Sequence, residues 1–171
     1  KFQNLKLILK DQSNLYDKKA EEYLDMIKTT KYGKYLNIDV INDIIFISKN
    51  LDLISLNRLY NLTDCYVSPY RAEGFNLPPL EAAAVGTPII VTKGGSTDDY
   101  FHPSLGLQID SVQFEKKDSR KVEPKIDSLI ECIERIILNP NNFGQIKGSQ
   151  FIQNNYNWKI ITNQLYKVFN E

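Results

Sequence analysis

Short apolar runs alternate along the chain with longer segments in which apolar residues recur every three or four positions. The runs are typical of β-strands, and near-continuous apolar character is typical of strands covered on both faces. They lie at residues 5–10, 44–47, 65–68, 88–92 and 105–109. Helical spacing follows the first three of them, at residues 16–27, 53–62 and 80–85. Strands that alternate with helices pair in parallel, so the pattern predicts an α/β fold with a Rossmann-like, doubly wound parallel sheet.

The last third of the chain is predicted to be helical. A stripe of isoleucines runs through residues 126–137, a break follows at Asn139-Pro140, and two further helices are expected, through Phe151 and over residues 158–169. Before them, residues 114–122 are charged and bounded by proline, which predicts a surface loop. The apolar stripes of these C-terminal helices are expected to be packing surfaces, and docking of a partner helix remains an alternative. A membrane-surface role is less favoured, since the polar faces mix charges of both signs and form no cationic strip.

The composition narrows the range of functions. The chain has 171 residues, 42% of them hydrophobic and 25% charged, as expected for a single domain over residues 1–171. The 21 Lys and Arg side chains equal the 21 Asp and Glu side chains in number and form no basic tract, so nucleic acid is not an expected partner. One histidine and two cysteines are too few for a zinc site with ordinary ligand spacing.

Cysteine usage and hydropathy predict the compartment. Cys65 and Cys132 lie in apolar runs without the paired spacing of a secreted scaffold, which favours reduced core thiols. No apolar run approaches the roughly 18 to 20 residues that cross a bilayer, so no transmembrane segment is expected and a cytoplasmic location is predicted. The sequence also opens directly on its first strand, which suggests a piece of a longer protein.

The segment from residue 64 to residue 100 carries the clearest chemical pattern. It contains a strand, a glycine-containing loop, a helix start, a second strand and a Gly-Gly loop. In a right-handed parallel β-α-β unit, the loops that follow both strands leave the same edge of the sheet, where open α/β sheets bind ligands. Residues 68–76 and 93–98 are therefore expected to form the two sides of one cleft.

A helix N-terminus in the first of these loops suits an anion. Asn76 is a candidate N-cap, and Pro78 and Pro79 fit the first helical turn, where a missing N–H costs least. The free donors would then be the backbone amides from Gly74 to Leu77. Because Gly74 lets the backbone come close to a ligand, a phosphate at this helix N-terminus is expected.

Two carboxylates eight positions apart, Glu73 and Glu81, bracket this loop. Neither suits a diphosphate, because a carboxylate beside a phosphate costs Coulomb energy, whereas a carboxylate that accepts two hydroxyl hydrogens matches a vicinal diol. We therefore expect Glu81 on a ribose and Glu73 near a sugar. The alternative for Glu81 is an exposed helix carboxylate without a role, and for Glu73 an ordinary loop acid or cap.

The string of motifs resembles the E-x7-E signature of retaining GT-B glycosyltransferases of the family-4 type. The matching elements are Ser68-Pro69, Glu73-Gly74-Phe75, Glu81-Ala82, Gly86-Thr87-Pro88 and Gly94-Gly95. The resemblance covers most of the chain as the family's C-terminal, donor-binding domain. It implies retaining transfer of a hexose from a nucleotide diphosphate sugar to a hydroxyl acceptor, such as a glycan, with no metal and no other cofactor.

The resemblance also implies roles for individual residues. The nucleotide base would lie near the loop that contains Ser48 and Leu51, and Glu81 would hold the ribose hydroxyls. Glu73 would be the catalytic residue at the donor sugar. The donor sugar and the diphosphate would contact Gly74, Phe75, Asn76, Leu77, Gly95, Ser96 and Thr97.

Two departures from the family pattern qualify this interpretation. The family normally has glycine where Asn76 stands. Its basic phosphate clamp and its N-terminal acceptor domain would precede Lys1, and none of the basic residues near the expected cleft, Lys10, Arg71 and Lys93, matches that clamp. We therefore expect a fragment that folds, reaches its acceptor only through the missing domain, and is inactive alone.

Other functions remain open at this stage. The chain could be a non-catalytic nucleotide-sugar-binding or scaffold module of a larger assembly, or belong to another GT-B enzyme such as a nucleotide-sugar epimerase. Several residues also have ordinary interpretations: Gly94-Gly95 as a simple turn, Asp98 as a cap of the short helix behind it, and Tyr70-Arg71 as a solvated loop instead of a gate. His102, the single imidazole, is expected to be a surface residue without a catalytic role.

Overall fold

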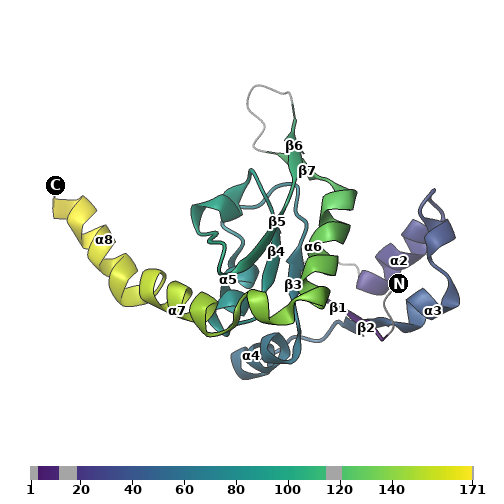
Figure 1. Cartoon of the computed structure of the whole chain (residues 1–171), viewed down its shortest axis with the longest axis horizontal. Coiled ribbons are helices and arrows are strands. Elements are labelled where there is room, and N and C mark those ends of the chain that lie inside the picture. Colours follow the sequence, from purple (N-terminus) through teal and green to yellow (C-terminus); the bar gives the residue numbers. More distant parts are fainter. Residues whose placement is uncertain (1–3, 12–18, 115–120, 171) are drawn as a thin grey trace. The chain divides into compact units, whose positions relative to one another are not determined.

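The computed structural model of the chain describes residues 4–11, 19–114 and 121–170. The expected single domain contains two compact units, Lys1–Asp52 and Leu53–Glu171. Each unit is described by itself below (Figure 1).

The first unit holds a parallel pair of strands. β1 (Leu7–Lys10) pairs with β2 (Ile44–Ile47) in a register that sets Leu7 opposite Ile44. Between them lie α2 (Ala20–Lys28), the 3-10 turn η1 (Gly33–Tyr35) and α3 (Ile38–Asn42). The parallel pairing and α2 confirm the prediction for this segment. Tyr16, in the first turn of the helix expected over residues 16–27, lies outside the described residues.

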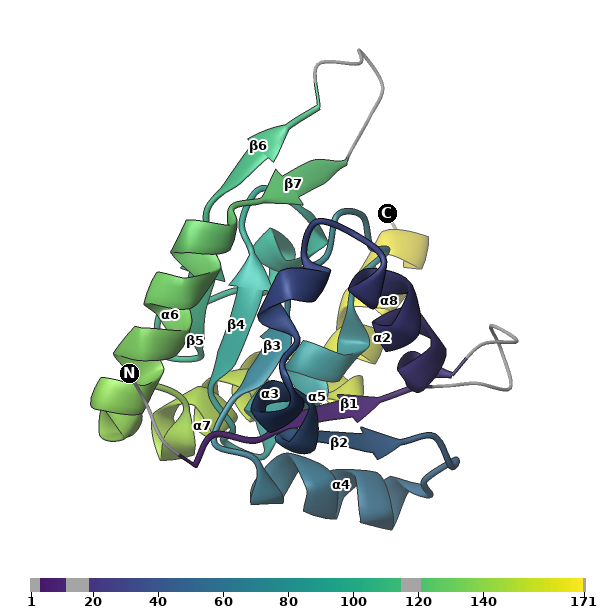
Figure 2. The same ribbon diagram turned by 90° about the vertical axis from the view of Figure 1, so that its right-hand side faces the viewer.

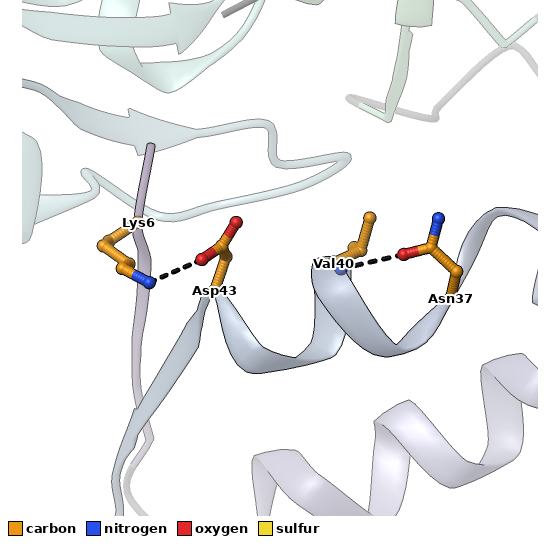
Figure 3. Close-up of polar contacts among 4 residues, drawn as sticks. All are labelled: Lys6, Asn37, Val40 and Asp43. Carbon is orange, nitrogen blue, oxygen red and sulfur yellow. Dashed lines mark hydrogen bonds and ion pairs between the residues drawn. The ribbon is translucent and has the colours of Figure 1, made fainter. Parts of the chain in front are cut away.

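Polar contacts fix both ends of α3, a helix that the hydrophobic pattern did not predict. Asn37 caps its start by accepting the amide of Val40 over 2.9 Å, and Asp43, directly after its end, pairs with Lys6 over 2.5 Å (Figure 3). Five residues are too few to show helical periodicity in a sequence. The cap and the ion pair therefore mark the two ends of α3, although its apolar residues show no helical pattern.

The second unit is built on a three-stranded parallel sheet. The strands β3 (Tyr66–Ser68), β4 (Ile89–Thr92) and β5 (Gly106–Ile109) run in the order β3-β4-β5 (Figure 2). All four residues of β4 are buried. This confirms the predicted parallel pairing and the predicted covering of the central strand on both faces.

Helices cover both faces of this sheet, as the alternating pattern predicted. In chain order the helices of this unit are α4 (Leu53–Leu62), α5 (Leu77–Ala84), η2 (Ser96–Asp99), α6 (Ile126–Leu138), η3 (Pro140–Asn142), α7 (Gln145–Asn155) and α8 (Trp158–Asn170). The expectation that residues 158–169 form a packing surface is wrong, because α8 has no buried residue and its Trp158 is 85% exposed. Residues of β4 divide between two cores. Ile89 and Val91 pack with Ala82 of α5, whereas Ile90 packs with Ile136 of α6.

A short antiparallel hairpin follows β5. β6 (Ser111–Gln113) pairs with β7 (Val122–Pro124), so the prediction that Val122 belongs to a surface loop is wrong. Val122 is 1% exposed, and its amide donates to the carbonyl of Arg71 over 2.8 Å. Residues 115–120 of the expected loop lie outside the described residues.

Both cysteines are free thiols, as predicted. Burial raises the pKa of Cys65 to about 12, with a smaller contribution from the negative charge of Asp64, so this thiol stays protonated and unreactive at neutral pH. None of the helices in the described residues is long and apolar enough to span a membrane.

Candidate functional site

Two loops leave the sheet of the second unit at the same edge. β3 and β4 are parallel, with Ser68 opposite Val91, so the loop after Ser68 and the loop after Thr92 both begin at the carboxyl ends of their strands. Ligands of open α/β sheets bind at such an edge. Both predicted site segments of this unit, residues 68–76 and 93–98, therefore lie there.

Tyr70 joins the two loops. Its hydroxyl lies 3.0 Å from the carbonyl oxygen of Thr92 and 2.8 Å from the hydroxyl of Thr97, and it accepts the amide of Thr97 over 3.1 Å. A Cβ on Gly95 would stand 2.7 Å from the Tyr70 hydroxyl, so glycine is required there for the close approach. Tyr70 is 9% exposed and is neither a gate nor a solvated loop residue, the two interpretations considered from the sequence.

Asn76 stands at the N-cap position of α5, as predicted, but its side chain does not cap the helix. The side-chain amide instead donates to the hydroxyl of Ser68 over 2.9 Å, and the backbone carbonyl oxygen of Asn76 accepts the hydroxyl of Tyr100 over 2.9 Å. The backbone of Asn76 is left-handed, with φ of 60°. Glycine adopts this conformation freely and asparagine more readily than most residues, which explains how Asn76 stands where the family normally has glycine.

Unpaired backbone donors gather at the start of α5. Pro78 and Pro79 occupy its first turn, and within the described residues the amides from Gly74 to Leu77 donate to no protein acceptor. A Cβ on Gly74 would meet no protein atom within 4 Å, so protein packing does not require a glycine there. The arrangement provides a helix N-terminus with free N–H groups and open space beside it, which is a chemical match for an anion.

Glu73 and Phe75 are exposed in this loop, on either side of Gly74. The Phe75 ring is tilted against the ring of Tyr100, with 5.3 Å between centroids. The pKa of Tyr100 is raised, chiefly by burial and further by neighbouring groups that include the Glu73 carboxylate. The Glu73 carboxylate thus lies within electrostatic range of the tyrosine that holds the end of the loop.

Glu81 lies on α5 and is exposed, yet a buried group contacts it. The hydroxyl of Tyr60 in α4 donates to its Oε2 over 3.0 Å. Burial raises the pKa of Tyr60, and the hydrogen bond and charge of Glu81 raise it further, so the phenol keeps its proton at neutral pH. The hydrogen bond from Tyr60 therefore restricts the orientation of the Glu81 carboxylate, which a freely solvated glutamate would not experience.

Asp98 stabilises the Gly-Gly loop through hydrogen bonds of its carboxylate. Its Oδ2 accepts the amide of Gly94 over 2.9 Å, and its Oδ1 accepts the side-chain amide of Gln108 over 2.6 Å. Gly94 has φ of +84°, a conformation that favours glycine. Asp98 thus fixes the loop in front of η2, and does not cap a helix behind it as one interpretation held.

The second loop offers fewer free donors than the sequence suggested. The amide of Thr97 is occupied by Tyr70, and Thr97 is fully buried. Within the described part of the chain, the amides of Gly95 and Ser96 have no protein acceptor. The side-chain oxygens of Thr92 and Ser96 are also buried without a hydrogen-bond partner there.

The two residues predicted near a nucleotide base, Ser48 and Leu51, belong to the first unit. The hydroxyl of Ser48 donates to Oδ2 of Asp11 over 3.0 Å, and the same oxygen accepts the amide of Ala20 over 2.8 Å. The carboxylate of Asp11 thus ties the end of β1 to the end of β2 and to the start of α2. The sequence pattern did not indicate this role of Asp11.

The remaining polar residues considered from the sequence have structural contacts. His102 stacks on Phe151, with 4.5 Å between ring centroids, and its Nδ1 lies 2.8 Å from the hydroxyl of Ser104. Arg71 forms a bidentate ion pair with Glu123 of β7, at 2.5 and 2.8 Å. Among the described residues no three His, Cys, Asp or Glu side chains gather as metal ligands would.

The parallel sheet with helices on both faces, and paired loops at its carboxyl edge, define an α/β domain of the Rossmann type. Comparison with known proteins identifies the class more closely. The profile of the family described as glycosyl transferases group 1 matches residues 36–158, and the chain belongs to this family.

The relatives agree with this assignment. A putative glycosyltransferase of a Sulfolobus islandicus filamentous virus is 32% identical over 115 residues, which are 64% of this chain and 38% of the viral protein. Sucrose synthase of Solanum tuberosum is 26% identical over 155 residues, 86% of this chain and 18% of that enzyme.

A solved structure confirms the fold. Sucrose-phosphate synthase from Thermosynechococcus elongatus superposes with a TM-score of 0.68 at 22% sequence identity, over 96% of this chain and 38% of that one. The chain therefore has the fold of the C-terminal domain of GT-B glycosyltransferases, as the motif resemblance implied. It spans between 18% and 38% of the length of these three proteins.

Proposed function

We propose that this chain is the donor-binding domain of a retaining glycosyltransferase, which moves a hexose from a nucleotide diphosphate sugar to a hydroxyl acceptor without a metal ion. The observation that carries the proposal is the row of unpaired amides from Gly74 to Leu77 at the start of α5, beside a glycine whose Cα faces open space. Free N–H groups at a helix N-terminus recognise a diphosphate with little need for lysine or arginine.

The same amides would assist the chemistry. Cleavage of the sugar–phosphate bond leaves negative charge on the departing diphosphate, and fixed donors stabilise such charge without reorganising during the reaction. The loop that carries these amides is held at both ends, by Tyr70 and by the contacts of Asn76. Glu73 would face the donor sugar, and Glu81 would accept the ribose hydroxyls.

Calorimetry with nucleoside diphosphates and their hexose conjugates tests the proposal. The chain should bind at least one of them, and Glu81→Ala should weaken binding about tenfold or more, because a charged acceptor for two hydroxyls is lost. Absence of binding by any common nucleotide would overturn the donor-site assignment. Anomeric analysis of the product made by the longer protein tests retention, and unchanged activity in excess chelator tests metal independence.

A further inference from the structure

Tyr60 is a buried titratable residue that contacts one of the two carboxylates in the proposed site. Its hydroxyl donates to Oε2 of Glu81 over 3.0 Å. The two residues lie 21 positions apart, on α4 and α5. The bond is therefore a contact between helices, set by their packing.

The hydrogen-bond donor of this pair, Tyr60, is rigidly placed. The Tyr60 side chain is 7% exposed, and its ring meets the edge of Tyr66 with 5.8 Å between centroids. The backbone carbonyl oxygen of Tyr60 accepts the hydroxyl of Thr87 over 2.7 Å and that of Thr63 over 3.0 Å. Both the ring and the backbone of Tyr60 are thus fixed to their surroundings.

The acceptor, by contrast, is an exposed glutamate whose side chain has several rotatable bonds. Such a side chain loses rotamer freedom when it binds a ligand, and that loss opposes binding. The Tyr60 hydroxyl, by donating to Oε2, selects one orientation of the Glu81 carboxylate before a ligand binds. Within the described residues Oε1 has no hydrogen-bond partner, so its lone pairs and the remaining one on Oε2 stay available.

We propose that Tyr60 is a positioning residue for ribose recognition: by holding Oε2 of Glu81, it presents the carboxylate to the vicinal hydroxyls of a ribonucleoside diphosphate. The inference rests on the proposed role of Glu81 in the donor site. It makes Tyr60 a determinant of the preference for ribose over 2′-deoxyribose, although Tyr60 itself does not touch the ligand.

Calorimetric titration with uridine, adenosine and guanosine diphosphates and their 2′-deoxy forms tests the inference. The wild type, Tyr60→Phe, Glu81→Ala and the double variant are compared, with binding measured well below each melting midpoint. Tyr60→Phe should raise the Kd for the ribonucleotide about tenfold and the Kd for the deoxynucleotide much less. In the Glu81→Ala background, Tyr60→Phe should change neither Kd, because a positioning residue acts only through the group it positions.

Tyr156→Phe is the matched control. It removes a tyrosine hydroxyl that makes one 3.0 Å bond to the carbonyl of Asp99, and it should leave both Kd values unchanged. If the wild type binds and Tyr60→Phe keeps its affinity and its ribose preference, the inference is wrong and the proposed function stands. If the effects of Tyr60→Phe and Glu81→Ala simply add, Tyr60 does not act through Glu81. If the wild type binds no nucleotide, the proposed function fails and this inference fails with it.

Discussion

The hydroxyl of Tyr70 accepts the backbone amide of Thr97 over 3.1 Å, and both residues are buried. Tyr70 follows β3 and Thr97 lies in η2, after β4, so this contact fastens one loop of the candidate site to the other. This contact holds the loop between Tyr70 and Asn76 at one end, and the hydrogen bonds of Asn76 to Ser68 and Tyr100 hold it at the other. The middle of the loop, with Glu73 and Gly74, is exposed. A preformed loop of this kind binds a ligand without first being ordered.

Replacing Tyr70 by phenylalanine should destabilise the second unit. The Thr97 amide would lose its acceptor in a buried position, which costs about 1–3 kcal/mol. Urea unfolding of the two proteins measures the difference. Tyr156→Phe removes one hydrogen bond of a less buried hydroxyl and should cost about 1 kcal/mol or less. Equal stability of Tyr70→Phe and the wild type would contradict the assigned contact.

Gly74 and Gly95 should respond oppositely to alanine. A Cβ at Gly74 meets no protein atom within 4 Å, so Gly74→Ala should leave stability unchanged or raise it by up to about 1 kcal/mol. Its Kd for a nucleoside diphosphate sugar should rise, because the methyl group occupies space needed by the ligand.

A Cβ at Gly95 would stand 2.7 Å from the Tyr70 hydroxyl, so Gly95→Ala should cost about 1–3 kcal/mol of stability. Unfolding curves and titrations of both variants separate the two effects. Unchanged donor binding by Gly74→Ala would show that the ligand does not approach that Cα.

At Asn76, the backbone conformation predicts the order of two substitutions. Asn76→Ala loses the bond to Ser68 and keeps a non-glycine residue at φ of 60°, so it should cost about 1–3 kcal/mol. Asn76→Gly loses the same bond but adopts this φ freely and should cost less. Thermal melts of the two variants provide the comparison, and a glycine variant less stable than the alanine variant would contradict the left-handed assignment.

The pair between Arg71 and Glu123 predicts a pH dependence. The bidentate hydrogen bond from Arg71 lowers the pKa of Glu123 below its ordinary value of 4.5. Because the folded-state pKa is depressed, the stabilising contribution of the pair is present above the ordinary pKa and is lost as the pH falls through the lowered one. An NMR titration should show a Glu123 midpoint below 4.5 in the wild type that rises in Arg71→Gln. Identical midpoints would show that the pair does not persist in solution.

Much of the fold was predictable because its elements carry local signals. The apolar runs at β3, β4 and β5 have the length and character of covered parallel strands, and Pro78 and Pro79 mark the start of α5. The hairpin of β6 and β7 was missed because three-residue strands, one ending in Pro124, lack a period-2 pattern.

Less of the candidate site than of the fold was predictable from the sequence. Motif spacing indicated Glu73, Gly74 and Glu81, but the residues that hold them are tyrosines whose hydroxyl partners lie more than 20 positions away in the sequence. The sequence pattern placed Tyr60 on the apolar face of a helix and Tyr70 in a loop, and it indicated none of the hydroxyl partners of Tyr60, Tyr70 and Tyr100, because such partners depend on tertiary packing. The left-handed backbone of Asn76 was equally hidden, since a good N-cap residue type suggests a capping side chain.

The central claim is that the free amides at the start of α5 bind the diphosphate of a nucleotide sugar. Titration of ¹⁵N-labelled chain with a nucleoside diphosphate hexose, followed by amide NMR, tests it most directly. We expect the amide resonances of Gly74, Phe75 and Leu77 to shift together with one Kd, while the amide resonance of Ile152, in the core on α7, does not move. Binding that leaves these three resonances in place, or no binding at all, would contradict it.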